Sequence, residues 1–180
     1  MELTKHKQEN TKTALSTFGY KTALAAPRLV KIVVSSGTGS GMKKDREKNE
    51  TIIDRLTKIT GQKPTLRIAK KSVASFKVRQ GDPIGVAVTL RGARMQHFLD
   101  KLVHIAIPRT KDFRGIDPKV VDNIGNMTLG IKEHNIFPET SDEDLRDVFG
   151  FAITLVSTAK SKEEAVAYFE HLGIPFKKEA

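Results

Sequence analysis

The spacing of apolar residues divides the chain into strands and helices. Between residues 84 and 91, Val86, Val88 and Leu90 alternate with small or polar residues, which predicts a half-buried strand. A β-branched run at 28–34 predicts a buried strand. Further strands that would complete a sheet are predicted at 65–69, 76–79, 127–132 and 151–157.

Helices are predicted between and after these strands, where apolar residues recur at helical spacing. The first covers about 46–60. The second begins at Gly92 and ends before Pro108, because proline cannot continue a helix. The last begins with Ser161-Lys-Glu-Glu164, a capping-box sequence, and ends at Gly173.

This order of elements predicts an α+β fold. A chain of 180 residues can bury one substantial core, so we expect a single domain over 1–180. Its sheet should be largely antiparallel, with helices packed on one face. The remaining predicted features are an N-terminal helical segment at 1–26, a turn at 35–41, a protruding basic hairpin at 72–84 and an irregular loop at 109–126.

Composition narrows the possible partners. The net charge of +10 and the pI near 9.8 favour an anionic partner. The absence of cysteine excludes disulfides and Cys-based zinc sites. No apolar run has the length of a membrane span or of a signal peptide, so we expect a cytoplasmic protein without membrane contact.

The positive charge is concentrated between Gly61 and Gly92, where seven Lys or Arg accompany a single acid, Asp82. Arrays of cations bind polyanions, and an aromatic residue such as Phe76 can stack on bases. Basic residues on a sheet edge can also serve only to prevent aggregation, and Phe76 could belong to the core. The polar Arg79–Pro83 stretch after Phe76 favours a protruding hairpin that contacts RNA or DNA.

Catalytic and cofactor motifs are not found. The glycine-rich stretch 36–44 follows a strand, but its spacing matches neither a Walker loop nor a dinucleotide-binding turn. The five histidines are scattered, and the acidic stretch 139–147 lacks calcium-loop spacing. We therefore expect no catalytic residues, no metal and no cofactor. The acidic stretch is interpreted as a solvated turn, or as a surface that docks a basic protein.

Several longer motifs resemble one family. Ser72-Val-Ala-Ser-Phe-Lys-Val-Arg-Gln-Gly81, Thr89-Leu-Arg-Gly92 and Ile107-Pro-Arg-Thr-Lys-Asp-Phe-Arg-Gly115 resemble the large-subunit ribosomal protein five family of bacterial type. Thr60-Gly-Gln-Lys-Pro64 and Gly173-Ile-Pro-Phe176 extend the resemblance over nearly the whole chain.

The resemblance implies a structural, non-enzymatic protein of the ribosomal central protuberance. Implied partners are 5S rRNA, 23S-type rRNA, peptidyl-site tRNA, a small-subunit head protein across an inter-subunit bridge, and neighbouring protuberance proteins. The rRNA-binding residues implied by the resemblance are Ser35, Gln62, Thr89 and Arg91. The basic residues Lys63, Lys70 and Lys71 are predicted to bind rRNA through their charge. The implied tRNA-binding residues are Phe76, Lys77, Arg79 and Gln80.

The sequence departs from the family pattern in places. In the predicted binding set, Ser35 stands where the family usually has asparagine. Two other functions remain open from the residues. The chain could be a stand-alone RNA-binding regulatory module that shares the ribosomal domain. It could also be an enzyme for a phosphate ligand bound at Gly37–Gly41.

Overall fold

A computed structural model describes residues 20, 22–38, 46–111, 113–141 and 148–177. The strands are β1 (Leu29–Gly37), β2 (Thr65–Ile68), β3 (Pro83–Leu90), β4 (Met127–Ile131) and β5 (Phe151–Ser157). The helices of more than two turns are α2 (Arg46–Thr60), α3 (Gly92–Lys101) and α4 (Lys162–His171). Short helical turns lie at 23–25, 102–106, 118–120, 134–136 and 138–140.

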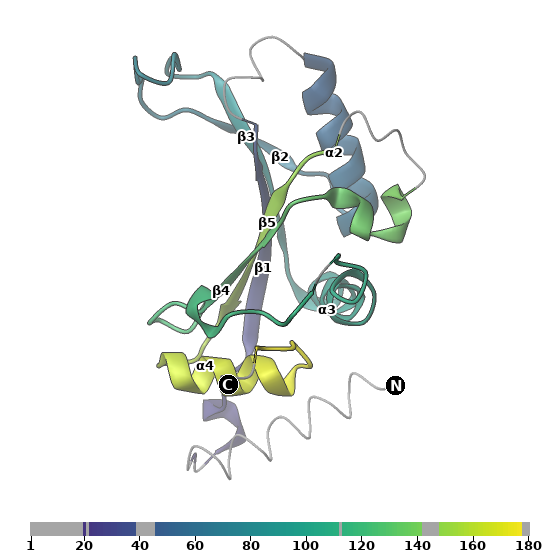
Figure 1. The fold of residues 1–180 in the computed structure, drawn as a ribbon. Helices are drawn as coiled ribbons and strands as arrows, with labels where there is room; N and C mark the ends of the chain where they lie inside the picture. Colours follow the sequence, from purple (N-terminus) through teal and green to yellow (C-terminus); the bar gives the residue numbers. More distant parts are fainter. Residues whose placement is uncertain (1–19, 21, 39–45, 112, 142–147, 178–180) are drawn as a thin grey trace.

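The strands form one antiparallel sheet in the order β2-β3-β1-β5-β4. Side chains alternate between its two faces, as the spacing predicted for β3. One face carries buried apolar residues of β1, β3 and β5, among them Ile32, Val88 and Ile153. In Figure 1, α2 and α3 lie on the same side of the sheet and leave the other side of its centre uncovered by any described helix. The predicted α+β class is confirmed.

The core lies between the sheet and these helices. Leu56 and Ile59 of α2 and Phe98 of α3 are almost completely buried there. The ring of Phe137, from the 134–140 turns, is 0% exposed and lies 6.0 Å from the rings of both Phe98 and Phe151. Phe137 therefore packs the 134–140 segment against both α3 and strand β5.

The last helix, α4, packs at the end of the sheet opposite the β2–β3 hairpin (Figure 1). Its predicted cap is present in part: Glu164 N–H donates to Ser161 Oγ at 3.3 Å. The Glu164 carboxylate instead accepts from the backbone of Lys160 at 2.8 Å and from the hydroxyl of Tyr20. That last hydrogen bond raises the pKa of Tyr20 to about 12 and ties the N-terminal side of β1 to the helix.

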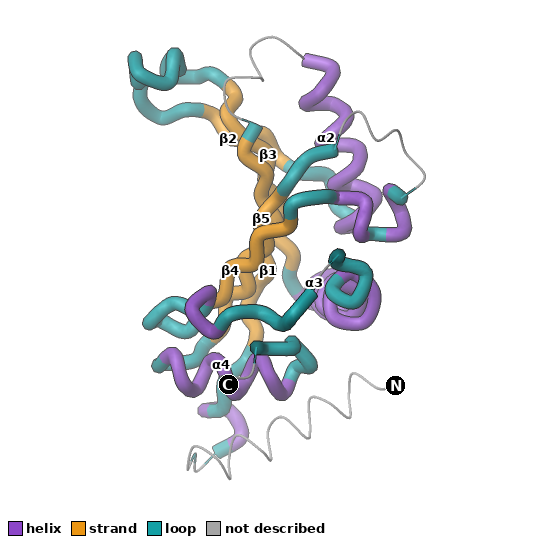
Figure 2. The backbone as a smooth tube through the Cα atoms, in the orientation of Figure 1, coloured by secondary structure: helices purple, strands orange, loops and turns teal. Residues whose placement is uncertain are grey.

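Two local predictions are wrong. Residues 76–79 form no strand: the chain turns through Ala74–Lys77, and only Val73 and Val78 pair across it (Figure 2). The ladder does not continue beyond this pair, because Arg79 N–H donates to the Asp82 carboxylate and Gln80 N–H donates to Ser72 Oγ. Ser35, Ser36 and Gly37, predicted as the start of a turn, belong to β1, because their backbones pair with 85–87 of β3.

Some predictions fall outside the described residues. These are most of the helical segment predicted at 1–26 (residues 1–19 and 21), most of the glycine-rich stretch (39–45) and most of the acidic stretch (142–147). In the described part, 109–126 is irregular as predicted, apart from the short turn at 118–120. No helix among the residues that the structure describes is long and apolar enough to cross a membrane.

Candidate nucleic-acid interface

The face of the sheet that no described helix covers is rich in hydroxyl groups. Strand register places one row of residues across it, with Ser35 opposite Ala87 on one side and Ala152 on the other. A second row runs through Val33, and its neighbours include three threonines. We call the open face the set formed by Val33, Ser35, Thr65, Ala87, Thr89, Thr128, Gly130, Ala152 and Thr154.

The side chains of the open face are small. Ala87 and Ala152 flank Ser35, and a Cβ added to Gly130 would meet no atom within 4 Å. Thr128 and Thr154 hydroxyls lie 3.2 Å apart on neighbouring strands. Short side chains of this kind can form directional hydrogen bonds with a partner that has a shallow surface. No long side chain of the open face would project into that partner.

One corner of the open face carries the predicted residues Gln62, Thr89 and Arg91. Gln62 follows α2, and its side-chain Nε2 donates to the carbonyl of Thr89 at 3.3 Å. Arg91 is exposed at the N-cap of α3, and its guanidinium lies 3.5 Å from the carbonyl of Val30. Lys63 is exposed next to Gln62. Folding therefore brings Gln62 to Thr89, which is 27 positions further along the sequence.

Arg94 belongs to this corner and was missed at the sequence level. Its Nη1 donates to Gln62 Oε1 at 3.4 Å from the first turn of α3. The contact fixes which way the Gln62 amide points, because an arginine can only donate. The signal available in the sequence was a second arginine three positions after Arg91, which places both near the start of one helix.

The β2–β3 hairpin carries the residues predicted to bind tRNA. Ala69 N–H donates to the Asp82 carbonyl at 2.8 Å, and Gly81 N–H donates to the Ala69 carbonyl at 3.0 Å. Gln80 N–H donates to Ser72 Oγ at 3.0 Å, and Arg79 N–H donates to the carboxylate of Asp82 at 2.6 Å. These bonds hold the neck of the hairpin while the side chains of Arg79 and Gln80 remain exposed.

The tip of the hairpin presents Phe76 to solvent, as predicted, with 72% of the residue exposed. Phe76 and Lys77 line an open groove of about 860 Å³ together with other apolar and basic residues of the hairpin. We call it the tip groove; its lining is Ala69, Lys70, Lys71, Val73, Ser75, Phe76, Lys77, Val78 and Ile84.

Lys70 and Lys71 were grouped with the rRNA-binding residues, but in the structure they line the tip groove together with Phe76. The hairpin projects from the end of the sheet near the start of β3, whereas Thr89 and Arg91 lie at the end of β3 (Figure 1). The predicted residues thus fall on two separate parts of the molecule, the open face with its corner and the hairpin. On the hairpin, Lys70, Lys71, Phe76 and Lys77 line the tip groove, whereas Arg79 and Gln80 lie outside its lining.

A second groove, of about 550 Å³, lies between the 109–117 loop and strand β4. Charged and apolar side chains line it: Arg109 and Lys111 are basic, Asp117 and Glu133 are acidic, and Phe113 is apolar. Nearby, Glu139 of the acidic stretch forms an ion pair with Lys101. Among the described residues, no three His, Asp or Glu side chains gather in a way that could hold a metal ion.

Two models of known protein families match this chain. Residues 23–79 match the family model described as "Ribosomal protein L5", and residues 83–176 match the model of the C-terminus of the same ribosomal family. Both surfaces described above therefore lie within segments typical of a ribosomal protein.

Curated relatives agree with the family models along most of the chain. A large ribosomal subunit protein uL5 from Natranaerobius thermophilus is 48% identical over 159 residues, 88% of each chain. A protein of the same name from Desulfatibacillum aliphaticivorans is 49% identical over 89% of each chain. Another from Thermoanaerobacter is 45% identical over 97% of each.

The chain belongs to the ribosomal protein L5 family. This confirms the resemblance seen in the motifs, and with it the expected class, a structural rRNA-binding protein of the large ribosomal subunit rather than an enzyme.

Proposed function

We propose that the ribosomal RNA bound by this chain is 5S rRNA and that the open face, with its corner at Gln62, Thr89 and Arg91, makes the contact. The observation that carries the proposal is the in-register array of hydroxyl and small side chains on an uncovered sheet. The minor groove of an RNA helix is wide and shallow and displays 2′-hydroxyls, so a surface of short polar groups can lie against it.

Each part of this surface has a distinct task. Hydroxyls such as that of Ser35 are placed to exchange hydrogen bonds with ribose and base edges, which sets the register of the RNA. Arg91 and Lys63 stand at the rim, where cations neutralise phosphates. A serine hydroxyl at position 35 is shorter than the asparagine usual in the family, so the RNA must approach β1 more closely there or use a water bridge.

The salt dependence of binding tests this arrangement. Arg91→Ala is expected to lower the slope of log affinity against log salt by about one, because one phosphate contact is lost. The measurement is 5S rRNA binding over a salt series, compared with a duplex of equal length and unrelated sequence. Lys58→Ala on α2, which covers the opposite face, serves as the control and should leave the slope unchanged. An unchanged slope for Arg91→Ala would remove it from the interface.

Arg94 is expected to act through Gln62 rather than through a phosphate. Arg94→Ala should weaken 5S rRNA binding about fivefold to tenfold, the cost of one hydrogen-bonded contact, with little change in the salt slope. In a Gln62→Ala background the same substitution should have a much smaller effect, since the two residues are coupled. Additive effects, or a slope lower by about one, would show instead that Arg94 binds RNA by itself.

We also propose that the hairpin contacts the peptidyl-site tRNA. Support comes from the exposed Phe76, the lysines of the tip groove and the separation of the hairpin from the open face. Phe76→Ala combined with Arg79→Ala should reduce tRNA retention on assembled ribosomes yet leave 5S rRNA binding nearly intact. Equal loss of both activities would mean that one surface serves both RNAs.

The groove beside the 109–117 loop supports a proposal for the small-subunit head protein. At the part of the groove formed by residues 109–113, Arg109 and Lys111 stand beside apolar surface, which suits a partner with an apolar anchor and acidic neighbours. Glu139 is engaged by Lys101, so this residue contributes less to an acidic docking surface than its sequence context predicted. Contacts with 23S-type rRNA and with neighbouring protuberance proteins stay predictions from the resemblance.

A further inference from the structure

We propose that the tip groove captures a single unpaired nucleobase of an RNA loop, with Phe76 stacking on it. The inference deepens the tRNA contact proposed above and rests on it. A phosphate contact alone would explain the lysines of the hairpin. It would not explain why they surround an apolar groove.

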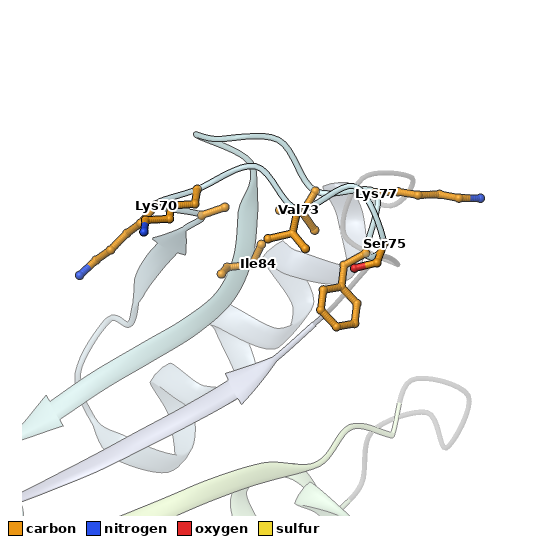
Figure 3. Close-up of a pocket in the computed structure, with 9 residues that line it drawn as sticks. Lys70, Val73, Ser75, Lys77 and Ile84 are labelled. Carbon is orange, nitrogen blue, oxygen red and sulfur yellow. The ribbon is translucent and has the colours of Figure 1, made fainter.

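The floor of the groove is aliphatic. Figure 3 shows Val73 and Ile84 pointing toward one another from the two sides of the hairpin, and both line the groove together with Ala69 and Val78. Val73 is 40% exposed, Ile84 is 37% exposed and Phe76 is 72% exposed. Three large apolar side chains thus stand partly or largely exposed in one groove, where they can contact a ligand.

The charges around the groove select the class of ligand. Lys70 and Lys77 extend in opposite directions from the groove, one at each end (Figure 3), and Lys71 lines it as well. A nucleotide within a strand has this same pattern, a flat apolar base with a phosphate on either side. An intact duplex does not fit, because its bases are stacked and present no open ring face to Phe76. An unpaired loop nucleotide does fit.

The backbone of the loop is held by its own hydrogen bonds. Val73 and Val78 exchange backbone hydrogen bonds of 2.9 and 3.2 Å, and Lys77 N–H donates to the Ala74 carbonyl at 3.0 Å, which closes a four-residue loop. Lys77 has a φ of 52°, the only positive value for a non-glycine residue in the part of the chain described. Such a conformation is disfavoured for lysine and persists where the surroundings impose it, often at binding sites. A preformed loop lowers the entropy lost on binding.

A tryptophan at position 76 provides a direct test, because the chain has no tryptophan of its own. The probe is a short RNA stem-loop with one unpaired purine in its loop, and the comparison probe is the same stem-loop with an abasic site there. The indole of Phe76→Trp should be quenched by the purine probe and not by the abasic probe. Quenching by both, or by neither, would overturn the base-capture assignment.

Affinity provides the second measurement. Phe76→Ala should bind the purine probe about tenfold more weakly, and Phe76→Trp should bind it as well as the unchanged protein or better. Ile124→Ala is the matched control, because Ile124 is an apolar residue of nearly the same exposure, 73%, in the 122–126 loop. Thermal unfolding should be nearly unchanged for all three variants, since both side chains are largely exposed.

The outcomes separate this inference from the broader tRNA contact. If Lys70→Ala with Lys71→Ala weakens tRNA retention but the abasic probe binds as well as the purine probe, the hairpin binds RNA backbone and base capture is wrong. If neither the lysine variants nor Phe76→Ala affects tRNA retention, the tRNA contact itself fails. Quenching of Phe76→Trp by an acidic amphipathic peptide, but not by the purine probe, would assign the groove to a protein partner.

Discussion

Replacing Ala152 with glutamate is expected to reduce 5S rRNA affinity at least a hundredfold while leaving the protein folded. Ala152 lies beside Ser35 near the centre of the open face and is only partly buried. A glutamate there would project a carboxylate into the plane that the RNA must approach. Steric separation and charge repulsion would then add, and a hundredfold loss corresponds to about 2.8 kcal/mol.

The control for this substitution is conservative. Ala152→Ser adds a hydroxyl of the kind already present at Ser35 and Thr154, so its affinity should change by less than about threefold. Thermal unfolding of both variants checks that the sheet persists. Full binding by Ala152→Glu would show that RNA does not lie across the centre of the open face, and the interface would then be limited to the corner at Gln62 and Arg91.

Replacing Phe137 with alanine is expected to lower the free energy of unfolding by about 3–5 kcal/mol, the range for truncating a fully buried phenylalanine. The ring is 0% exposed and packs against Phe98 and Phe151, so its loss leaves a cavity between the sheet and α3. Denaturant unfolding measures the effect. Phe137 belongs to neither proposed RNA surface, so 5S rRNA affinity should be nearly unchanged at temperatures where the variant stays folded.

A volume-conserving variant separates cavity formation from other causes. Phe137→Leu should cost clearly less than Phe137→Ala, because most of the space stays filled. Equal losses for the two variants would indicate that the aromatic contacts themselves matter more than the filled volume. A large loss of 5S rRNA affinity in folded Phe137→Ala would contradict the separation between the core and the RNA interface.

Much of the fold follows from local spacing. The helix at 46–60 and the strand at 151–157 were predicted with the bounds that the structure shows, because each has a regular apolar face that only one kind of element can bury. The two wrong predictions lie where pairing with a neighbouring strand decides whether a segment is a strand or a turn. Composition predicted a turn at Ser35–Gly37, but these residues pair with β3 and extend strand β1. Residues 76–79 were predicted as a strand, but the only pairing there is the single bridge between Val73 and Val78.

The site was predictable in kind, since clustered cations and one exposed aromatic indicate a polyanion partner. Its division into two surfaces was not. Lys70 and Lys71 stand close in sequence to Gln62, but the hairpin carries them to the tip groove. Arg94 seemed an ordinary helix residue until α3 brought it within hydrogen-bonding distance of Gln62.

The sequence by itself determined the elements, the basic character and, through its motifs, the family. Each of these depends on residues near one another in the chain, where hydrophobic period, capping groups and charge act locally. Only the tertiary structure decided which hydroxyls share one face, which lysines surround Phe76 and how Gln62 is oriented. Those relations depend on strand register and on the docking of helices, both of which join residues that are distant along the chain.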